Sequence, residues 1–366
     1  MPPLFTPLVQ SLPSSVPFVG PEALERRTGT RIRARIGANE SVFGPSPAVV
    51  AAMREAAPEV WQYCDPENHA FRFALARHLG VSPSNVMVGE GIDGLLGLAI
   101  RLFVKPGVSV ATSQGAYPTF GFHVHGFGGR LVTTPYVNDH EDPSSLLDLA
   151  LREDARVIYF ANPDNPMGSW WDAATIEKMI AALPDDALLV LDEAYGEFAP
   201  EGTLPRLDVT KPNVLRFRTF SKAYGMAGMR LGYCIGHADV ISAFDKIRNH
   251  FGITRMGQIA GVAALADQNH LRSVVARVET ARGQIAAIAR ENGLTPLPSA
   301  TNFVTIDCGR DGEYAKRILD ALVANGVFVR MPGIAPLNRC IRITAGMPED
   351  LAVLAEELPR ALQAAG

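Results

Sequence analysis

The sequence predicts an α/β fold: a large domain built on a parallel β-sheet with helices on both faces, followed by a smaller α+β domain. Short apolar runs alternate with helical patterns over residues 86–191, as is typical of a parallel sheet buried on both faces. After Arg230, a long helical tract with few helix breakers precedes a second mixture of strands and helices. A chain of 366 residues is long enough for two such domains.

Element boundaries in the first part follow from caps, turn residues and apolar runs. Ser46 and Pro47 open a helix, with serine at the cap and proline in the first turn. Lys105-Pro106-Gly107 closes another helix, and the very apolar run Ala187–Leu191 indicates a buried strand. We expect strands at residues 86–88, 108–111, 130–134, 157–160, 187–191 and 214–217. We expect helices at 46–56, 68–80, from 92 to the 105–107 turn, from 118, at 143–152 and at 173–183.

The second part begins with a helical tract over residues 255–292, which connects the two domains. Strands are expected after it at 301–307, 327–330 and 341–344, and helices at 313–325 and from 348. The proline-rich start of the chain predicts an extended N-terminal arm. We therefore expect an arm over 1–40, a large domain over 41–252 and a small α+β domain over 253–366.

Composition argues against several classes of protein. The net charge is −4, so no excess of positive charge favours nucleic acid or an anionic membrane. No apolar run reaches the roughly 18 residues that span a bilayer, and the first residues lack the pattern of a signal peptide. The cysteines are far apart and form no CxxC pair, which favours buried thiols in a cytoplasmic protein. They are Cys64, Cys234, Cys308 and Cys340.

Four groups of polar residues fall where predicted strands end, which is where ligands of open α/β sheets bind. Gly89–Gly94 leads into a helix, whose first N–H groups can hold an anion. Asn162–Gly168 is a proline-rich turn, and Asp192–Tyr195 begins with an acid after a buried strand. The stretch 219–230 holds two hydroxyls, Lys222 and an arginine. Each group alone is also compatible with a turn, a salt bridge or a surface lysine, but together they indicate one site.

This set of side chains suits pyridoxal 5′-phosphate (PLP). A lysine such as Lys222 forms a Schiff base with the cofactor, and an acid such as Asp192 pairs with its pyridinium nitrogen. Helix N–H groups, hydroxyls and a guanidinium hold its phosphate.

The order of the motifs GIDG, NPDNPMG, DEAYGEF, TFSKAYGMAGMRLGY and CIRITAG resembles the fold-type-I, class I/II aminotransferases. Within that family, GANESVFGPSP is similar to the opening motif of the histidinol-phosphate aminotransferase branch. The resemblance runs from about Ile36 to the C-terminus. It implies a large PLP-binding domain with a mostly parallel seven-stranded sheet covered by helices, a small α+β C-terminal domain, and a cytoplasmic homodimer with shared active sites.

The resemblance also implies a role for each matching residue around the cofactor. Lys222 would carry the cofactor and move the proton, and Asp192 would pair with the pyridine nitrogen. Tyr195 and Asn165 would contact the 3-oxygen of the ring, and Tyr117 would stack on its face. The phosphate would be held by Gly91, Ile92, Asp93, Thr219, Ser221, Arg230 and the partner subunit's Tyr63.

Substrate-binding residues are implied in the same way. Arg342 matches an arginine that grips a substrate carboxylate or phosphate, Arg330 matches a second anion-binding arginine, and Asn39 belongs to the opening motif. Phe18 and Phe43 stand where histidinol-phosphate enzymes usually have tyrosines. Phenylalanine has no hydroxyl, so a phosphate would lose a donor, while an aromatic substrate would gain apolar contact. Histidinol phosphate and an aromatic amino acid are therefore both candidate amino donors.

The expected activity is transfer of an amino group from that donor to 2-oxoglutarate by a ping-pong mechanism, within histidine or other amino-acid biosynthesis. The first alternative is a PLP-dependent decarboxylase or lyase related to threonine-phosphate decarboxylase. The second is a regulator that keeps the cofactor fold without turnover, for which the short arm leaves no room for a DNA-binding domain. We expect no metal site, because His123 and His125 lack a third ligand nearby, and we expect the tryptophans Trp170 and Trp171 to serve packing.

Overall fold

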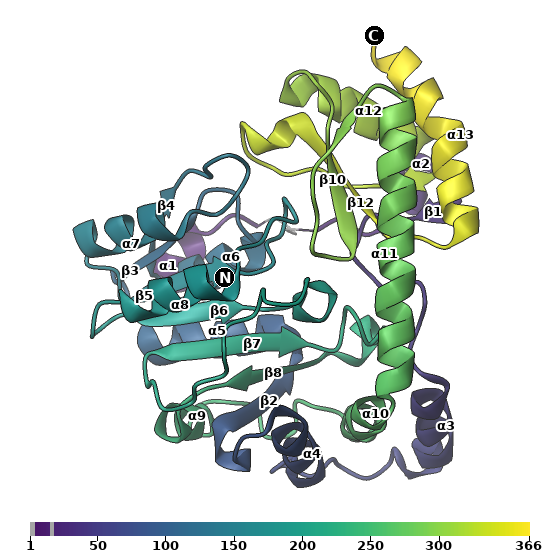
Figure 1. Cartoon of the computed structure of the whole chain (residues 1–366). Coiled ribbons are helices and arrows are strands. Elements are labelled where there is room, and N and C mark those ends of the chain that lie inside the picture. The colour runs from purple at the N-terminus through teal and green to yellow at the C-terminus, as the bar shows by residue number, and fades with distance from the viewer. Residues whose placement is uncertain (1–3, 15–17) are drawn as a thin grey trace.

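The computed structural model describes residues 4–14 and 18–366. Within these residues the main sheet has seven strands in the order β2-β8-β7-β6-β5-β3-β4 (Figure 1). The strands are β2 (Val86–Glu90), β3 (Ser109–Ser113), β4 (Arg130–Thr134), β5 (Val157–Ala161), β6 (Leu188–Asp192), β7 (Val214–Thr219) and β8 (Leu231–Ile235). Neighbours pair in parallel, except that β8 is antiparallel to both β2 and β7. The expected α/β fold with a mostly parallel seven-stranded sheet is confirmed.

Helices cover both faces of this sheet. Those nearest to it are α5 (Gly91–Phe103), α6 (Pro118–Gly126), α7 (Pro143–Arg152) and α8 (Ala173–Ala181). Successive strand residues point to opposite faces, so Tyr159 of β5 packs in the core with α5 and α6, while Phe160 packs in the core beneath α7 and α8. Burial of both faces explains why the central strands have nearly continuous apolar sequences.

A further group of helices packs against β2 and β8 at the edge of the sheet. It contains α3 (Pro47–Ala56), α4 (His69–Leu79) and α10 (Arg255–Ala266). As expected, Ser46 caps α3: its hydroxyl accepts from the N–H groups of Ala48 and Val49. The remaining elements of the large part are α9 (Ala238–Phe244) and the short 3-10 helices η1 (Ala57–Glu59), η2 (Pro83–Asn85), η3 (Gly196–Phe198) and η4 (Ala227–Met229).

The smaller part is an α+β unit that follows the long helix α11 (Gln268–Glu291). An antiparallel sheet in the order β12-β10-β9 lies beside a parallel pair of β1 and β11. Its elements are β1 (Ala34–Arg35), β9 (Thr295–Pro296), β10 (Phe303–Asp307), α12 (Gly312–Ala324), β11 (Val327–Phe328), η5 (Leu337–Arg339), β12 (Cys340–Thr344) and α13 (Pro348–Ala365). Helix α11 runs from the level of α10 to the level of α12, alongside both parts (Figure 1).

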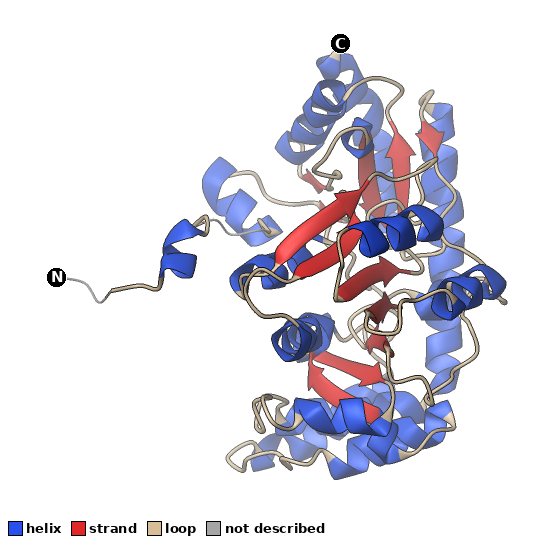
Figure 2. Ribbon diagram, turned by 90° about the vertical axis from the view of Figure 1, so that its left-hand side faces the viewer, coloured by secondary structure: helices blue, strands red, loops and turns tan. Residues whose placement is uncertain are grey.

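The N-terminal segment forms an arm, as the sequence predicts, but its described residues include two short helices that were not expected. It contains α1 (Pro7–Ser11) and α2 (Pro21–Thr28), and α1 projects away from the body (Figure 2). Each helix begins at a proline, where the fixed φ angle suits the first turn and no N–H group is needed. The same prolines favour extended backbone in the sequence, which explains why these two helices were not predicted.

Two other elements differ from the prediction. The sequence between Arg230 and residue 255 suggested neither β8 nor α9, because its small residues and prior motif hide the apolar run LGYCI. The expected single helical tract over 255–292 is divided at Asp267, whose carboxylate accepts from the N–H of His270 and so caps α11.

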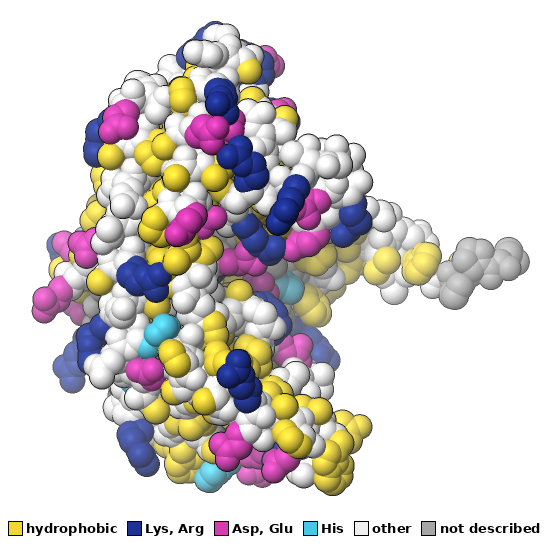
Figure 3. Space-filling model, turned by 90° about the vertical axis from the view of Figure 1, so that its right-hand side faces the viewer, with side chains coloured by type: hydrophobic (Ala, Val, Ile, Leu, Met, Phe, Trp, Pro, Cys, Tyr) yellow, Lys and Arg dark blue, Asp and Glu magenta, His cyan; other side chains and the backbone are white. Residues whose placement is uncertain are grey.

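The surface and the helices bear on the partners considered above. On the face that Figure 3 displays, acidic and basic side chains are interspersed, and no field of one sign dominates. Among the residues that the structure describes, no helix is both long and apolar enough to cross a membrane. All four cysteines are buried and free.

Candidate active site

The carboxyl ends of β2, β5, β6 and β7 meet at one edge of the main sheet, because these strands run in the same direction. Gly91 follows β2, Asn165 lies in the turn after β5, Asp192 ends β6 and Lys222 follows β7. The four groups that the sequence places at strand ends are therefore brought together in space.

A candidate anion-binding cup, formed by Gly91, Asp93, Ser221 and Arg230, lies at the first turn of α5. Arg230 Nη1 donates to Ser221 Oγ at 3.5 Å, and Arg230 Nη2 lies 3.6 Å from Asp93 Oδ2. Gly91 has a φ of 73°, and a Cβ atom on it would lie 2.5 Å from Arg230 Nη2. Only glycine therefore lets the guanidinium approach the helix N-terminus, where unpaired N–H groups favour an anion. Thr219 lies behind the cup, where its Oγ1 accepts from the N–H of Ser221 at 3.1 Å.

Tyr117 forms one wall of the site beside the cup. Its hydroxyl donates to Asp93 Oδ1 at 2.7 Å, which fixes the direction of the phenol ring. The ring of Phe18 stacks on it with a centroid distance of 6.5 Å and an angle of 23°. This wall therefore presents aromatic faces from α6 and from the N-terminal segment.

Asp192 is a buried carboxyl group with two hydrogen bonds. Tyr159 Oη donates to Asp192 Oδ2 at 2.6 Å, and the N–H of Ala194 donates to Oδ1 at 2.9 Å. Burial raises the pKa of Asp192 to about 6, against the lowering effect of these two donors. A cationic N–H beside the carboxylate would compensate for its lost hydration.

Lys222 is held between the small part and the turn after β6. Its Nζ donates to the carbonyl oxygen of Asn39 at 3.1 Å and lies 5.7 Å from the centroid of the Tyr195 ring. Asn39 Nδ2 in turn donates to Tyr195 Oη at 2.9 Å, and Thr344 Oγ1 donates to Asn39 Oδ1 at 3.1 Å. Burial, together with repulsion by Arg342, lowers the pKa of Lys222 to about 8. A neutral amine, which is the nucleophilic form, is therefore accessible near neutral pH.

Two arginines, Arg342 on β12 and Arg330 just after β11, line the other side of the site. The backbones of Arg330 and Arg342 pair with each other in an antiparallel bridge. Arg342 Nη1 donates to Asn165 Oδ1, and within the described residues Arg342 Nε has no partner although it is buried. Arg330 Nη2 donates to the carbonyl oxygen of Val19 at 2.9 Å, and its guanidinium carbon lies 5.3 Å from the centroid of the Phe18 ring. Burial, and to a smaller extent the charge of Arg330, lowers the pKa of Arg342, so the two positive charges lie near each other.

The turn that carries Asn165 is supported by a buried pair of acids. Asp164 and Glu141 are each 1% exposed. Tyr136 Oη donates to Asp164 Oδ1 at 2.9 Å, and the N–H of Ala161 donates to Glu141 Oε1 at 3.2 Å. Burial and the neighbouring Asp164 raise the pKa of Glu141 well above its usual range, and burial raises the pKa of Asp164 to about 6. Burial therefore favours the protonated form of both acids.

The structure does not bring every predicted residue into this cluster. Tyr63 is 81% exposed and packs against the ring of Phe251 at 5.0 Å, on the surface of the same chain. Phe43 lies under the guanidinium of Arg277 at 4.3 Å and packs against the main core. Their expected roles at the cofactor and the substrate stay predictions.

Two residues of the cluster were not anticipated. Tyr159 looks like a core residue in the sequence, because it lies within the apolar strand VIYFA. Asn302 Nδ2 donates to the carbonyl oxygen of Asn39 at 3.1 Å, so that this oxygen accepts from both Asn302 and Lys222. Neither contact could be inferred from sequence spacing, since the first joins residues 33 positions apart and the second residues 263 positions apart.

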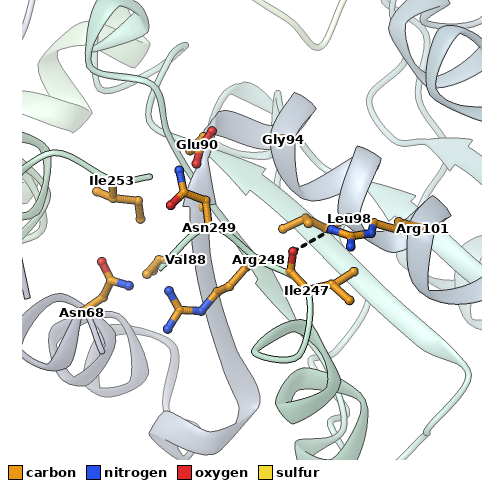
Figure 4. A pocket seen from close by; sticks show the side chains of 11 residues that line it. Asn68, Val88, Glu90, Gly94, Leu98, Arg101, Ile247, Arg248, Asn249 and Ile253 are labelled. Atoms are coloured by element: carbon orange, nitrogen blue, oxygen red, sulfur yellow. Dashed lines mark hydrogen bonds between the residues drawn. The ribbon is translucent and has the colours of Figure 1, made fainter. Parts of the chain in front are cut away.

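A separate pocket of about 270 Å³ lies on the far side of the first turn of α5 (Figure 4). Glu90, Arg101 and Arg248 line it together with apolar side chains. Arg101 Nη1 donates to the carbonyl oxygen of Ile247 at 2.9 Å, and Arg248 donates to the carbonyl oxygen of Pro66 at 2.7 Å and to Asp245. Its guanidinium groups are thus bound to protein oxygens, and the reactive groups gather at Lys222 instead.

The cluster fits PLP in its chemistry. The N-terminal turn of α5 and Arg230 supply donors for a phosphate, and the missing Cβ of Gly91 keeps that space open. Asp192 is a desolvated acid that suits a pyridinium N–H, and Lys222 is a buried amine of lowered pKa. Arg342 Nε, which has no partner among the residues that the structure describes, suits an anionic group of a substrate.

Comparison with known proteins agrees with this fit. Residues 34–358 match the model of the family described as aminotransferase class I and II. The chain belongs to this family, and the expectation of a PLP-dependent aminotransferase is confirmed.

Similar proteins place the chain near one branch of the family. It is 56% identical, with a TM-score of 0.96, to a crystal structure of histidinol-phosphate aminotransferase from Sinorhizobium meliloti in complex with PLP, covering 99% of this chain and 98% of that one. It is 38% identical over 350 residues to histidinol-phosphate aminotransferase of Anaeromyxobacter sp. (strain Fw109-5), covering 94% of this chain and 95% of that protein. L-threonine-O-3-phosphate decarboxylase from Porphyromonas gingivalis shares the fold, with a TM-score of 0.77 at 18% identity, covering 90% of this chain and 99% of that one.

The lowered pKa of Lys222 predicts how the apoenzyme reacts with PLP. The rate at which added PLP develops visible absorption should rise with pH, with a midpoint near 8, because only the neutral amine reacts. Arg342→Met removes a like charge and should move the midpoint upward. A midpoint near about 10.4, the pKa of an unperturbed lysine, would contradict the burial of Lys222.

The buried Glu141 predicts a pH dependence of stability. The pKa of Glu141 is raised in the folded state. At a pH above the ordinary pKa of a glutamic acid, the native protein therefore binds more protons than the unfolded chain does. The free energy of unfolding should therefore fall as pH rises from about 4.5 toward the folded-state pKa. Glu141→Gln has no proton to lose, and urea unfolding of the apoprotein between acid and neutral pH should show a smaller decline. Glu55→Gln, at an exposed site on α3, is the control and should follow the wild type.

Proposed function

We propose that this aminotransferase moves an amino group from an anionic amino donor, histidinol phosphate, to 2-oxoglutarate by a ping-pong mechanism, and that it serves histidine biosynthesis. The observation that carries the substrate proposal is the backbone pairing of Arg330, just after β11, with Arg342 on β12, which brings two positive charges near each other. The names of its relatives support the same substrate. In a ping-pong exchange, the oxo product of the donor leaves before the keto acid binds.

Lys222, Asp192 and the phosphate cup are the proposed cofactor-binding residues. Lys222 Nζ would bind the cofactor covalently and, once released, move the proton at the substrate α-carbon, since it is a buried amine of lowered pKa. Asp192 would hold a proton on the pyridine nitrogen, oriented by Tyr159 and Ala194. When bound, PLP supplies the electron sink that accepts the charge left by that proton. Gly91, Ile92, Asp93, Thr219, Ser221 and Arg230 would hold its phosphate.

Other residues around Lys222 would orient the reactants. Tyr195 is held by Asn39 and by an edge contact with Phe303 at 5.5 Å, so its hydroxyl has one direction. Tyr117 would cover the face of the ring, and Asn165 would align Arg342 through their hydrogen bond. Burial of this cluster excludes water and strengthens each charge-assisted contact.

Substrate selection is assigned to Arg342, Arg330 and the N-terminal segment. Arg342 would bind the anion common to both half-reactions, and Arg330 would add the contact that a phosphate needs. Phe18 covers Arg330 and faces Tyr117, which supports an apolar or aromatic group on the donor next to its anion. An aromatic amino acid is therefore the second donor to be compared.

The assembly is proposed to be a homodimer with shared sites, found in the cytoplasm. Leu4 and Phe5 on the N-terminal segment are 98% and 61% exposed, and Trp61 and Tyr63 are each 81% exposed. Large apolar side chains at such exposure are typical of surfaces that bind another protein. A second copy of the chain would cover them, and the partner subunit's Tyr63 would then reach the phosphate cup.

Replacement of the lysine tests the assignment of the cofactor. Purified wild-type protein should show a visible absorption band that borohydride fixes onto Lys222. Lys222→Ala should lack this adduct and lose at least about a thousandfold in kcat, because both the covalent link and the proton transfer are removed. A fully active Lys222→Ala enzyme would sink the proposal. Release of carbon dioxide without an oxo product would favour the decarboxylase alternative.

Replacement of Arg330 tests the choice of donor. If histidinol phosphate is the donor, Arg330→Ala should lower kcat/KM for it by about 10- to 100-fold, the effect of losing a hydrogen bond to a charged group worth ~1.5–3 kcal/mol. The half-reaction with glutamate should change far less, since Arg342 holds a carboxylate. Single-turnover rates with histidinol phosphate, phenylalanine, tyrosine and glutamate measure this. An unchanged rate with histidinol phosphate would point to a carboxylate donor.

A further inference from the structure

Arg339, the last residue of η5 and directly before β12, joins the two parts of the molecule. Its Nε donates to Asp307 Oδ2 at 2.8 Å, and its Nη2 donates to Asp139 Oδ2 at 2.7 Å. Asp307 ends β10 in the small part, whereas Asp139 lies between β4 and α7 in the large part. About a quarter of each of the three side chains is exposed to solvent, so the ion pairs are partly shielded from water.

Asp139 is presented to Arg339 by a constrained turn. The backbones of Val137 and His140 exchange hydrogen bonds of 2.9 and 3.0 Å. The two residues between them, Asn138 and Asp139, have φ angles of 50° and 63°, in the left-handed region. Asparagine and aspartate tolerate this region better than other non-glycine residues, although it still costs free energy. The turn thus holds the Asp139 carboxylate in a fixed place.

The same contact continues into an apolar cluster between the parts. Leu337 and Cys340, on either side of Arg339, pack with Met167 and with the partly buried Tyr136. Tyr136 directly precedes the constrained turn, and its hydroxyl binds Asp164 in the turn that carries Asn165. Met167 belongs to that turn as well. The Arg339 contact is therefore mechanically linked to the segment that faces Arg342.

We propose that Arg339 is a positioning residue, whose ion pairs with Asp139 and Asp307 hold β12 against the large part and so set the place of Arg342 over the cofactor site. Arg339 ends η5 directly before β12, and Arg342 lies three residues later on that strand, where its guanidinium meets Asn165 of the large part. The inference rests on the proposed role of Arg342 as the anion-binding residue. We call these two ion pairs of Arg339 the clamp. Loss of the clamp lets Arg342 move away from Asn165 and Lys222.

Asp139→Asn is the variant that tests the clamp with least disturbance. Asparagine keeps the shape of the side chain and tolerates the left-handed backbone, so the protein should fold, but the charge is lost. Arg339→Lys removes the forked contact but keeps the positive charge, whereas Arg339→Met removes both. Arg130→Gln is the matched control, since Arg130 forms a 2.8 Å ion pair with Glu153 on the surface of the same part, away from β12.

With holoenzyme, Asp139→Asn should raise KM for the amino donor about two- to fivefold, the range of a partly exposed ion pair, with little change in kcat or in the absorption of the bound cofactor. Arg339→Met should raise KM similarly, and combining it with Asp139→Asn should raise KM little further. Arg339→Lys should raise KM less than Arg339→Met does. High salt should shrink the difference from the wild type. Arg130→Gln should have no effect on KM.

A second measurement does not depend on the donor. Arg342 repels Lys222, so a displaced Arg342 should move the pH midpoint of PLP binding by the Asp139→Asn apoenzyme upward, toward the value of Arg342→Met. If KM and this midpoint both stay at wild-type values, or if only the thermal stability falls, the clamp has no positioning role and the proposal is overturned. If no amino donor turns over, the proposed function fails, while the midpoint still decides the role of Arg339.

Discussion

Burial of ionisable groups at the carboxyl edge of the main sheet is the constraint on which the site depends. Removal from water raises the pKa of Asp192 and lowers the pKa of Lys222, so each group is shifted toward its neutral form. The acid then gains most from a cationic partner, and the amine becomes a nucleophile near neutral pH. Parallel strands make this possible, because they end at one edge and deliver both side chains from neighbouring backbones, while the strand interiors stay apolar.

A buried ion network on the far face of the same strands supports this arrangement. Arg216 Nε and Arg218 Nε donate to the two oxygens of Glu193, each at 2.9 Å. Glu193 follows Asp192 directly, and nearby opposite charges keep its pKa low in spite of complete burial. Breaking such a network leaves uncompensated buried charge, so the ends of β6 and β7 are fixed relative to each other. Asp192 and Lys222 inherit that fixed geometry.

The sequence predicted the strands that carry the site because buried parallel strands have continuous apolar sequences and end at polar motifs. It missed the two short helices of the N-terminal arm, α1 and α2, which begin at prolines, and it missed β8, whose run LGYCI overlaps the motif around Arg230. Side-chain contacts across distant segments were beyond it for a physical reason. Arg339 and Asp139, which form an ion pair, are 200 positions apart in the sequence. Tyr159 differs from an ordinary core tyrosine only in that its hydroxyl donates to Asp192.

Helix α11 has a consequence for how the molecule unfolds. At 24 residues it is about 36 Å long, and its buried side chains, Val274 and Ile285 among them, belong to one continuous apolar core that contains residues of both sheets. Neither part can lose its packing without exposing a stretch of the helix that the other part shares. The large and small parts therefore form one cooperative unit. Such a unit resists partial opening by heat or protease more than two domains joined by a flexible linker would.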